Sequence, residues 1–194
     1  FNKDQAIVIQ DAYAMGDQLQ SFKDEVLKNS SITNGSISGF LPVAGTSRND
    51  NVYWPEGVDP SQDNMVSLQV WSVDQDYVPT LGMEIIEGRN FSRDFPSDSG
   101  AAILNEAALK MFNFSKDPIG KKITTVGGGI GADGKPNTVS FEVIGLLKDF
   151  HFESLKQSIT PVALFLRKST SRISFRFQAS DTQDVINTIQ NTWT

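Results

Sequence analysis

Acid–base chemistry in this chain would centre on its one histidine, His151. Asp149 precedes it by two residues, and residues so spaced share a face of a strand, where the carboxylate could orient the imidazole. An acyl-transfer enzyme also needs an activated nucleophile, and the sequence contains no G-x-S-x-G motif. We therefore interpret this segment as the end of a strand, with Phe150 and Phe152 packed and His151 at the surface. We predict no catalytic residue.

A glycine-rich stretch at residues 127–136 is the only sequence that superficially suggests a phosphate-binding loop. A P-loop needs G-x-x-x-x-G-K-[ST] at the start of a helix, but here Pro136 and Asn137 follow Gly134 and Lys135. Five glycines within residues 127–134 make regular structure entropically costly. We expect a mobile hairpin tip and predict no bound cofactor.

Carboxylates in loops could suggest calcium, but the D-x-[DN]-x-[DN]-G pattern is absent. We interpret these side chains as solvated loop acids and predict no metal site. They are Asp59, Asp63, Asp94, Asp98 and Asp133.

Paired glutamates and strand aromatics suggest two carbohydrate-related functions. A glycosidase could use two of Glu84, Glu87 and Glu106, provided that they flank a cleft at a fixed separation. A free-standing carbohydrate- or peptide-binding module could use a groove lined by Tyr53, Trp54 and Trp71. We retain this binding module as the alternative function, and a hydrolase that uses the glutamates or Asp149 and His151 as a third hypothesis.

The composition limits the class of protein. The 194 residues carry a net charge of −6 with a pI of about 4.8, which argues against binding to nucleic acid. The absence of cysteine excludes disulfides and thiolate chemistry within the chain. No apolar run approaches the roughly 18 residues needed to cross a bilayer. We interpret the chain as an excised soluble piece with membrane segments removed on both sides.

The first part of the chain has a strand–helix–strand pattern. Residues 6–9 form a short apolar run, and residues 32–41 resemble a second strand. Between them, apolar side chains recur at helical spacing, with polar ones, including Lys23, on the opposite face. The apolar positions are Met15, Leu19, Phe22 and Val26.

The middle of the chain is rich in predicted strands. These cover residues 52–57, 65–73, 83–88, 101–104, 123–126 and 139–147. Asp74 and Asp76 are suited to cap a short helix that Gly82 ends, and Asn105 is suited to cap a second one.

The end of the chain predicts two strands, at 161–167 and 173–178, and a final helix. Ser180–Gln183 matches the capping-box pattern, and Val185, Ile186, Ile189 and Trp193 would face inward. The pattern predicts an α+β fold with two lobes. Residues 1–45 plus 155–194 would form a discontinuous α/β lobe. Residues 46–154 would form an inserted, mostly β lobe with one or two short helices.

Six motifs occur in order between residues 73 and 152 of the chain. They are V-D-x-D-Y at 73–77, L-G-M at 81–83, E-G-R-N-F at 87–91, I-L-N-E-A-A at 103–108, D-P-I-G-K at 117–121 and V-I-G-L-L-K-D-F-H-F at 143–152. In this order they resemble the MacB-like periplasmic core domain of FtsX-type ABC transporter permeases.

This resemblance implies a non-catalytic domain on the periplasmic side of the bacterial inner membrane, between the first and second of four membrane helices. It implies a membrane-proximal α/β lobe, with Asp4 and Trp193 near each other at the membrane. The implied partners are a cytoplasmic ATP-binding subunit or domain and a second permease copy. A periplasmic adaptor, a peptide or a lipoprotein would be a further partner or cargo, and the sequence does not choose among them.

Overall fold

The computed structural model describes residues 4–42, 49–114, 117–150 and 158–193. His151 and most of the loop at 44–51 lie outside the described residues. Helices and strands are mixed along the chain, which confirms the predicted α+β class. The chain forms two compact units: unit 1 comprises residues 1–41, 72–83 and 167–194, and unit 2 comprises residues 42–71 and 84–166.

The two units have different bounds from the predicted lobes. Residues 72–83 belong to unit 1, although they lie inside the range predicted for the inserted lobe, and residues 155–166 belong to unit 2. The assignment of the lobes as membrane-proximal and inserted stays a prediction.

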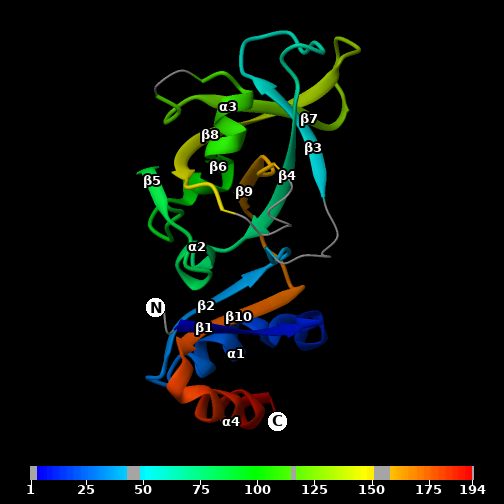
Figure 1. Cartoon of the computed structure of the whole chain (residues 1–194). Helices are drawn as coiled ribbons and strands as arrows, with labels where there is room; N and C mark the ends of the chain where they lie inside the picture. The colour runs from blue at the N-terminus through cyan, green and yellow to red at the C-terminus, as the bar shows by residue number, and fades with distance from the viewer. Residues whose placement is uncertain (1–3, 43–48, 115–116, 151–157, 194) are drawn as a thin grey trace. The chain divides into compact units, whose positions relative to one another are not determined.

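Unit 1 is a three-stranded antiparallel sheet with helices packed against it (Figure 1). The first strand of the chain, β1, pairs along its whole length with the last strand, β10, and β10 pairs with β2. Its elements are β1 (Asp4–Gln10), the 3₁₀ helix η1 (Ala12–Gln18), α1 (Leu19–Val26), β2 (Ile32–Ser38), α2 (Tyr77–Thr80), β10 (Arg172–Gln178), the 3₁₀ turn η3 (Ala179–Asp181) and α4 (Thr182–Trp193).

The predicted amphipathic helix of unit 1 is interrupted. Gly16 has φ 52° and ψ −126°, so the helical path is kinked inside η1, before α1 begins at Leu19. Leu19, Phe22 and Val26 of α1 are buried against Phe175 and Val185, which confirms the apolar face of α1. The pattern did not reveal the break because Met15 still packs against the same cluster.

The C-terminal helix forms without the predicted capping box. The Ser180 hydroxyl donates to Asp181 instead (3.0 Å), and η3 precedes α4. Val185 and Ile189 are buried as predicted, whereas Trp193 is about half exposed.

Asp4 and Trp193 were expected to lie close together, and their contacts do not fit that expectation. Asp4 pairs with Gln178, four residues before α4, whereas the Trp193 ring contacts Phe22 at 5.6 Å at the far end of that helix. Twelve helical residues separate the two sites by about 18 Å.

In unit 2, the strands are hydrogen-bonded in a closed order. This order is β4-β3-β7-β8-β6-β9, and β9 pairs with β4 again, while β5 joins β8. The elements are β3 (Asp50–Pro55), β4 (Val66–Val73, whose last two residues belong to unit 1), β5 (Ile85–Gly88), the 3₁₀ helix η2 (Pro96–Gly100), β6 (Ala101–Asn105), α3 (Glu106–Met111), β7 (Lys122–Ile130), β8 (Pro136–Leu147) and β9 (Val162–Leu166).

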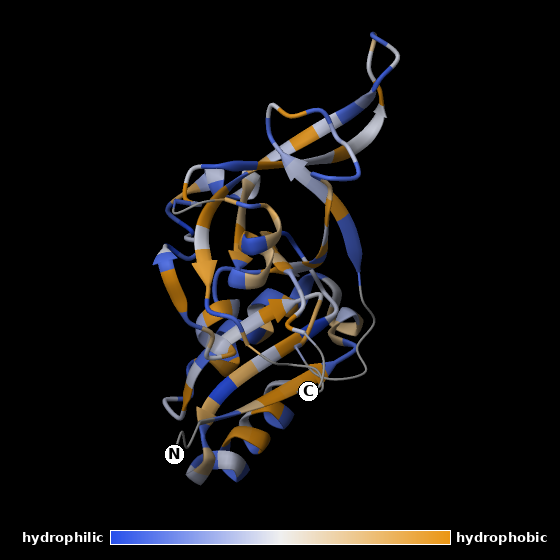
Figure 2. Cartoon of the chain, turned by 45° about the horizontal axis from the view of Figure 1, so that its top comes forward, coloured by the Kyte–Doolittle hydropathy of each residue, from blue (hydrophilic) through white to orange (hydrophobic). Residues whose placement is uncertain are grey.

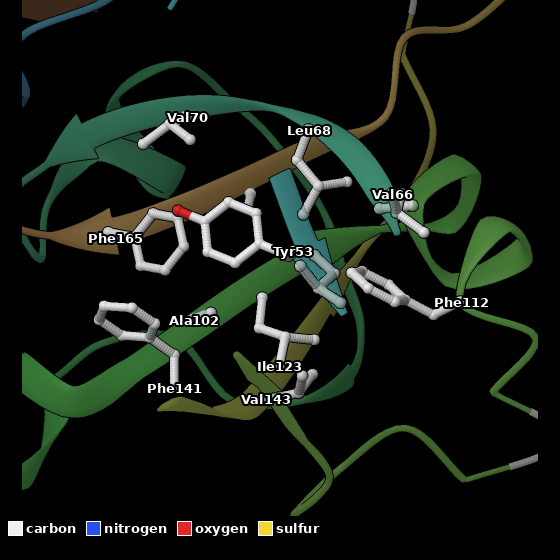
Figure 3. Close-up of a cluster of buried hydrophobic side chains, with 13 residues drawn as sticks. Tyr53, Val66, Leu68, Val70, Ala102, Phe112, Ile123, Phe141, Val143 and Phe165 are labelled. Carbon is white, nitrogen blue, oxygen red and sulfur yellow. The ribbon is translucent and has the colours of Figure 1, made fainter. Parts of the chain in front are cut away.

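The core of unit 2 lies inside this closed sheet (Figure 3). Tyr53 stacks on Phe165 with ring centroids 5.6 Å apart, and Phe141 meets Phe165 edge-on at 4.7 Å. Alternating strand residues point toward this cluster, which explains why period-two patterns identified the strands.

The glycine-rich stretch is more regular than predicted. β7 continues through Gly127, Gly128 and Gly129 to Ile130, and only residues 131–135 form the turn before β8. A register shift between Val126 and Ile130 accommodates the glycines.

Gly88 provides a test of the close pairing between β5 and β8. Its φ is +75°, and a Cβ there would overlap the carbonyl oxygen of Ile144. Gly120 has a similar φ of +82° but open space around it. We expect Gly120→Ala to cost about 1 kcal/mol of unfolding free energy through strain alone, and Gly88→Ala to cost about 3 kcal/mol or more because the backbones must also separate.

Urea unfolding followed by the fluorescence of Trp54 and Trp71, both in unit 2, measures this difference. Equal losses for the two variants would contradict the close β5–β8 pairing.

Candidate functional site

A buried ion cluster in unit 1 forms at the first motif. Lys23 of α1 has a side chain that is only 1% exposed, and its Nζ lies 2.8 Å from Oδ2 of Asp74 and 2.8 Å from Oδ2 of Asp76. A buried ammonium is costly unless it is paired, and two carboxylates pair it here. We call Lys23, Asp74 and Asp76 the Lys23 cluster.

Asp74 connects this cluster to the sheet. Its Oδ1 accepts from the Ser36 hydroxyl (2.6 Å) and from the Asp76 backbone N–H (3.2 Å). Its Oδ2 also accepts from the backbone N–H of Ile37 (2.8 Å). One carboxylate therefore joins α1, β2 and the turn before α2.

The two aspartates differ in how they meet their predicted role. The Asp74 carboxylate accepts from the Asp76 N–H at the turn that leads into α2, as predicted, whereas the Asp76 side chain makes no cap and binds Lys23. Gly82 ends this segment with φ +67°, as predicted.

Two further contacts hold residues 72–83 within unit 1. The Tyr77 hydroxyl donates to the Phe40 carbonyl (3.0 Å), and burial raises the pKa of this phenol well above its ordinary value. Arg176 of β10 donates to the Thr80 carbonyl (3.3 Å) and covers Gly82 so closely that a Cβ would lie 2.6 Å from its Nη1. The segment therefore belongs to unit 1 because of polar contacts at several points.

Unit 2 has a second buried carboxylate, in Asp98. Two Arg89 nitrogens donate to its oxygens at 2.8 and 2.7 Å, and the Ser92 backbone N–H donates at 2.9 Å. The hydrogen bonds from Arg89 hold the pKa of Asp98 below its usual value. The prediction that Asp98 is a solvated loop acid is therefore wrong, because Arg89 pairs with it inside the fold.

The N-terminus of α3 forms a third polar group. Asn105 accepts from the Ala108 N–H at 3.0 Å, which confirms the predicted cap. Asp149 accepts from the Ala107 N–H (2.9 Å), and Glu106 accepts from the Asp149 N–H (2.8 Å). Asp149 therefore stabilises a helix end, and its proposed partner His151 lies outside the described residues.

The predicted glutamate pairs are not brought together by any contact among the described residues. Glu84 pairs with Lys148 (2.9 Å) at the surface, Glu106 binds the Asp149 backbone, and Glu87 is exposed.

The aromatic residues of the alternative function do not line a groove together. Tyr53 and Trp71 are at most 1% exposed, and Trp54 is 6% exposed. The Trp71 indole N–H donates to Gln69 (3.0 Å), and its ring meets Phe150. Tyr53 and Trp71 are packing residues, and Trp54 borders a groove of unit 2 that neither of them lines. The binding-module alternative therefore loses the three-ring surface on which it depended.

In the described part of the chain, no three His, Asp or Glu side chains gather as a metal site would require. None of its helices is both long and apolar enough to cross a membrane.

Lys23 is the residue that sequence reasoning missed, because we assigned it to the polar face of its helix. A usable signal was present: Lys23 lies four residues after Leu19 and three before Val26, beside the apolar stripe. The two acids of V-D-x-D-Y supply the matching charges. The one ammonium group bridges the two carboxylates and so holds these segments together.

Comparisons with known proteins agree with this arrangement of motifs. A family model described as "MacB-like periplasmic core domain" matches residues 2–191. The periplasmic region of MacB from Actinobacillus actinomycetemcomitans is structurally similar, with a TM-score of 0.54, 11% identity, and coverage of 98% of this chain and 84% of that one. The extracellular domain of the noncanonic ABC-type transporter YknZ from Gram-positive bacteria gives a TM-score of 0.52, 11% identity, and coverage of 86% and 76%. No curated protein matches the sequence.

Replacing Lys23 by Met tests the cluster. The change leaves Asp74 and Asp76 without their cation, and removing one partner of a buried ion pair costs about 3–5 kcal/mol. We expect amides of residues 72–83 to exchange hydrogen at least on the order of 100-fold faster. The control is Lys28→Met, since Lys28 is 72% exposed and pairs with exposed Glu25. Exchange rates that match between the two variants would exclude the anchoring role.

Asp98 predicts a specific dependence of stability on pH. Its folded pKa is lowered, so its stabilising contribution is complete above the unfolded value of about 3.9 and is lost as the pH falls through the folded value. We expect Asp98→Asn to lower the unfolding free energy by about 1–3 kcal/mol at pH 7 and to flatten its decline below pH 4. Urea unfolding between pH 7 and 2.5 measures this, with exposed Asp94→Asn as the control. A slope in acid equal to the parent's would contradict the pairing.

Proposed function

The chain belongs to the family of MacB-like periplasmic core domains, and we propose that it transmits ATP-driven conformational change to partners or cargo outside the membrane. ATP would be hydrolysed by a cytoplasmic ATP-binding subunit or domain, and two permease copies would work together. The domain itself would be non-catalytic and would lie on the periplasmic side of the bacterial inner membrane. The match over residues 2–191 is the observation that carries this proposal.

The arrangement of unit 1 supports a mechanical role. β1 and β10 pair residue for residue from Asp4↔Gln178 to Gln10↔Arg172, so the first and last strands belong to one sheet. Movement applied to either strand would reach the other through that ladder. We propose that unit 1 is the membrane-proximal lobe and that unit 2 meets partners or cargo.

The Lys23 cluster supports the next step of this mechanism. It fastens residues 72–83 to α1 and β2, and the chain enters unit 2 at both ends of this segment. We propose that this segment carries displacement of unit 1 into unit 2.

Spin-label distances in the full-length permease, purified with its ATP-binding subunit, test this function. This domain has no native cysteine, so the spin label attaches within it only at the introduced cysteines. Labels at Tyr13→Cys in unit 1 and Met111→Cys in unit 2, both exposed sites, report on the two units. We expect the distance distribution to change between the nucleotide-free and ATP-trapped states, with labelled copies diluted by unlabelled ones.

Two label pairs serve as controls. Tyr13→Cys with Lys28→Cys lies within unit 1, and Met111→Cys with Ile130→Cys lies within unit 2. Both should keep their distributions, because each unit moves as one body. Nucleotide-independent distances between the units, or failure of any ATP-binding polypeptide to co-purify, would overturn the proposal.

A further inference from the structure

Unit 2 contains a groove beside its longest hairpin. The groove has a volume of about 550 Å³, which lies in the range of peptide and small-ligand sites. One wall is the face of the β7–β8 hairpin, and the other is the turn between β3 and β4. Its lining comprises Trp54, residues 56–60, Thr124, Val126, Lys135, Pro136, Thr138 and Ser140.

The walls carry exposed aliphatic side chains. Val126 is 56% exposed and Val58 47%, and Ile130 beyond the groove is 72% exposed. Hydrophobic residues recur along the hairpin among hydrophilic ones (Figure 2). Exposed apolar side chains that gather beside a groove mark an interaction surface more often than scattered ones do.

The groove also lies where β3 separates from β7. Backbone pairing between these strands ends at Trp54↔Thr124, and the Thr125 hydroxyl still donates to the Val52 carbonyl (2.8 Å). Beyond Thr125, no other strand in the described part of the chain pairs with this edge of β7 toward Ile130. Gly127, Gly128 and Gly129 follow there without side chains, and a Cβ on Gly128 would meet nothing within 4 Å. Glycine inside a strand often marks a place where another backbone approaches closely.

The charges of the groove balance. Glu56 is neutralised by Lys122 at 3.7 Å, which leaves one carboxylate, on Asp59, and one ammonium, on Lys135. A strongly charged ligand would meet a like charge on one wall, whereas an uncharged one would not. The Gly128 carbonyl of β7 already accepts from the Asn137 side-chain amide (3.1 Å). The other backbone donors and acceptors along this edge are ones that an extended peptide matches and a hydrocarbon chain does not.

We propose that this groove binds an extended, uncharged segment of a partner protein, with aliphatic side chains at alternate positions, which pairs with the free edge of β7. This inference rests on the proposed function, which places the domain and its partner protein outside the membrane. Val58 and Val126 hold the aliphatic side chains, and the glycines allow the backbones to approach.

The probe is the peptide acetyl-Thr-Val-Thr-Val-Thr-amide, added to the chain while its backbone amide resonances are recorded by NMR. We expect shifts confined to residues 54–60, 124–130 and 136–140. The same peptide N-methylated at alternate residues loses backbone donors, so its binding should weaken at least tenfold. An analogue with Asp or Lys in place of Val should weaken by a similar factor.

The matched variants are Val126→Asp in the groove and Ile86→Asp outside it. Both replace exposed aliphatic side chains in strands of unit 2. Val126→Asp should weaken peptide binding at least tenfold, while Ile86→Asp leaves the affinity at the parent value.

Three outcomes overturn the inference: no shift at millimolar peptide, equal affinity of the N-methylated peptide, or equal loss in both variants. Monomeric lysophosphatidylcholine that shifts the same resonances while the peptide does not would identify a lipid site instead. These results are independent of the spin-label distances, so the groove and the transmission mechanism can fail separately.

Discussion

The structure of unit 1 depends on the burial of one ammonium group. Lys23 is held among apolar side chains of α1 and the sheet, where an unpaired charge would be unstable. Asp74 and Asp76 satisfy it at 2.8 Å each, and both follow β4 in the chain. A stretch from the middle of the sequence must therefore lie on a unit built otherwise from its two ends. Such a cluster adds specificity more than net stability, since an apolar replacement of all three groups could stabilise as well.

Unit 2 is held together by a different constraint, the closure of its sheet. Because β9 pairs with β4, the six strands surround a single core. The buried pair of Arg89 and Asp98 and the cap of α3 fix the connections around this core. Each unit thus has its own internal constraint, as the proposed movement of one unit against the other would require.

The sequence predicted what local patterns determine and missed what distant contacts determine. Period-two alternation located strands such as 173–178, and a short apolar run located β6, whose five residues are all buried. Asn105 and Gly82 were recognised because their roles depend on neighbouring residues. The bounds of the units differ at residues 72–83 because Lys23 lies 51 residues from Asp74, and no window contains both. The glycines of β7 were assigned to a loop because the strand propensity of glycine is low. That propensity takes no account of backbone pairing with β8, which extends the strand. Asp98 was predicted to be solvated because no calcium-binding pattern surrounds it. Its actual partner is the Arg89 guanidinium, nine residues earlier, and no local motif marks that pairing.

Connectivity gives these constraints a mechanical meaning. The chain crosses between the units four times, after residues 41, 71, 83 and 166, and two of these crossings flank the segment held by the Lys23 cluster. In the proposed mechanism, a displacement of β2 or α1 would reach both crossings, because Asp74 accepts from Ile37 while Asp76 binds Lys23. The crossing after residue 166 follows β9, and its first residue in unit 1, Arg167, donates to the Val73 carbonyl (3.1 Å), one residue before Asp74. Three of the four crossings are therefore tied to one small region around Asp74. Under the proposed transmission of force, displacement of the sheet of unit 1 would pass through this region, and the stiffness of these partly buried polar contacts would set how closely unit 2 follows unit 1.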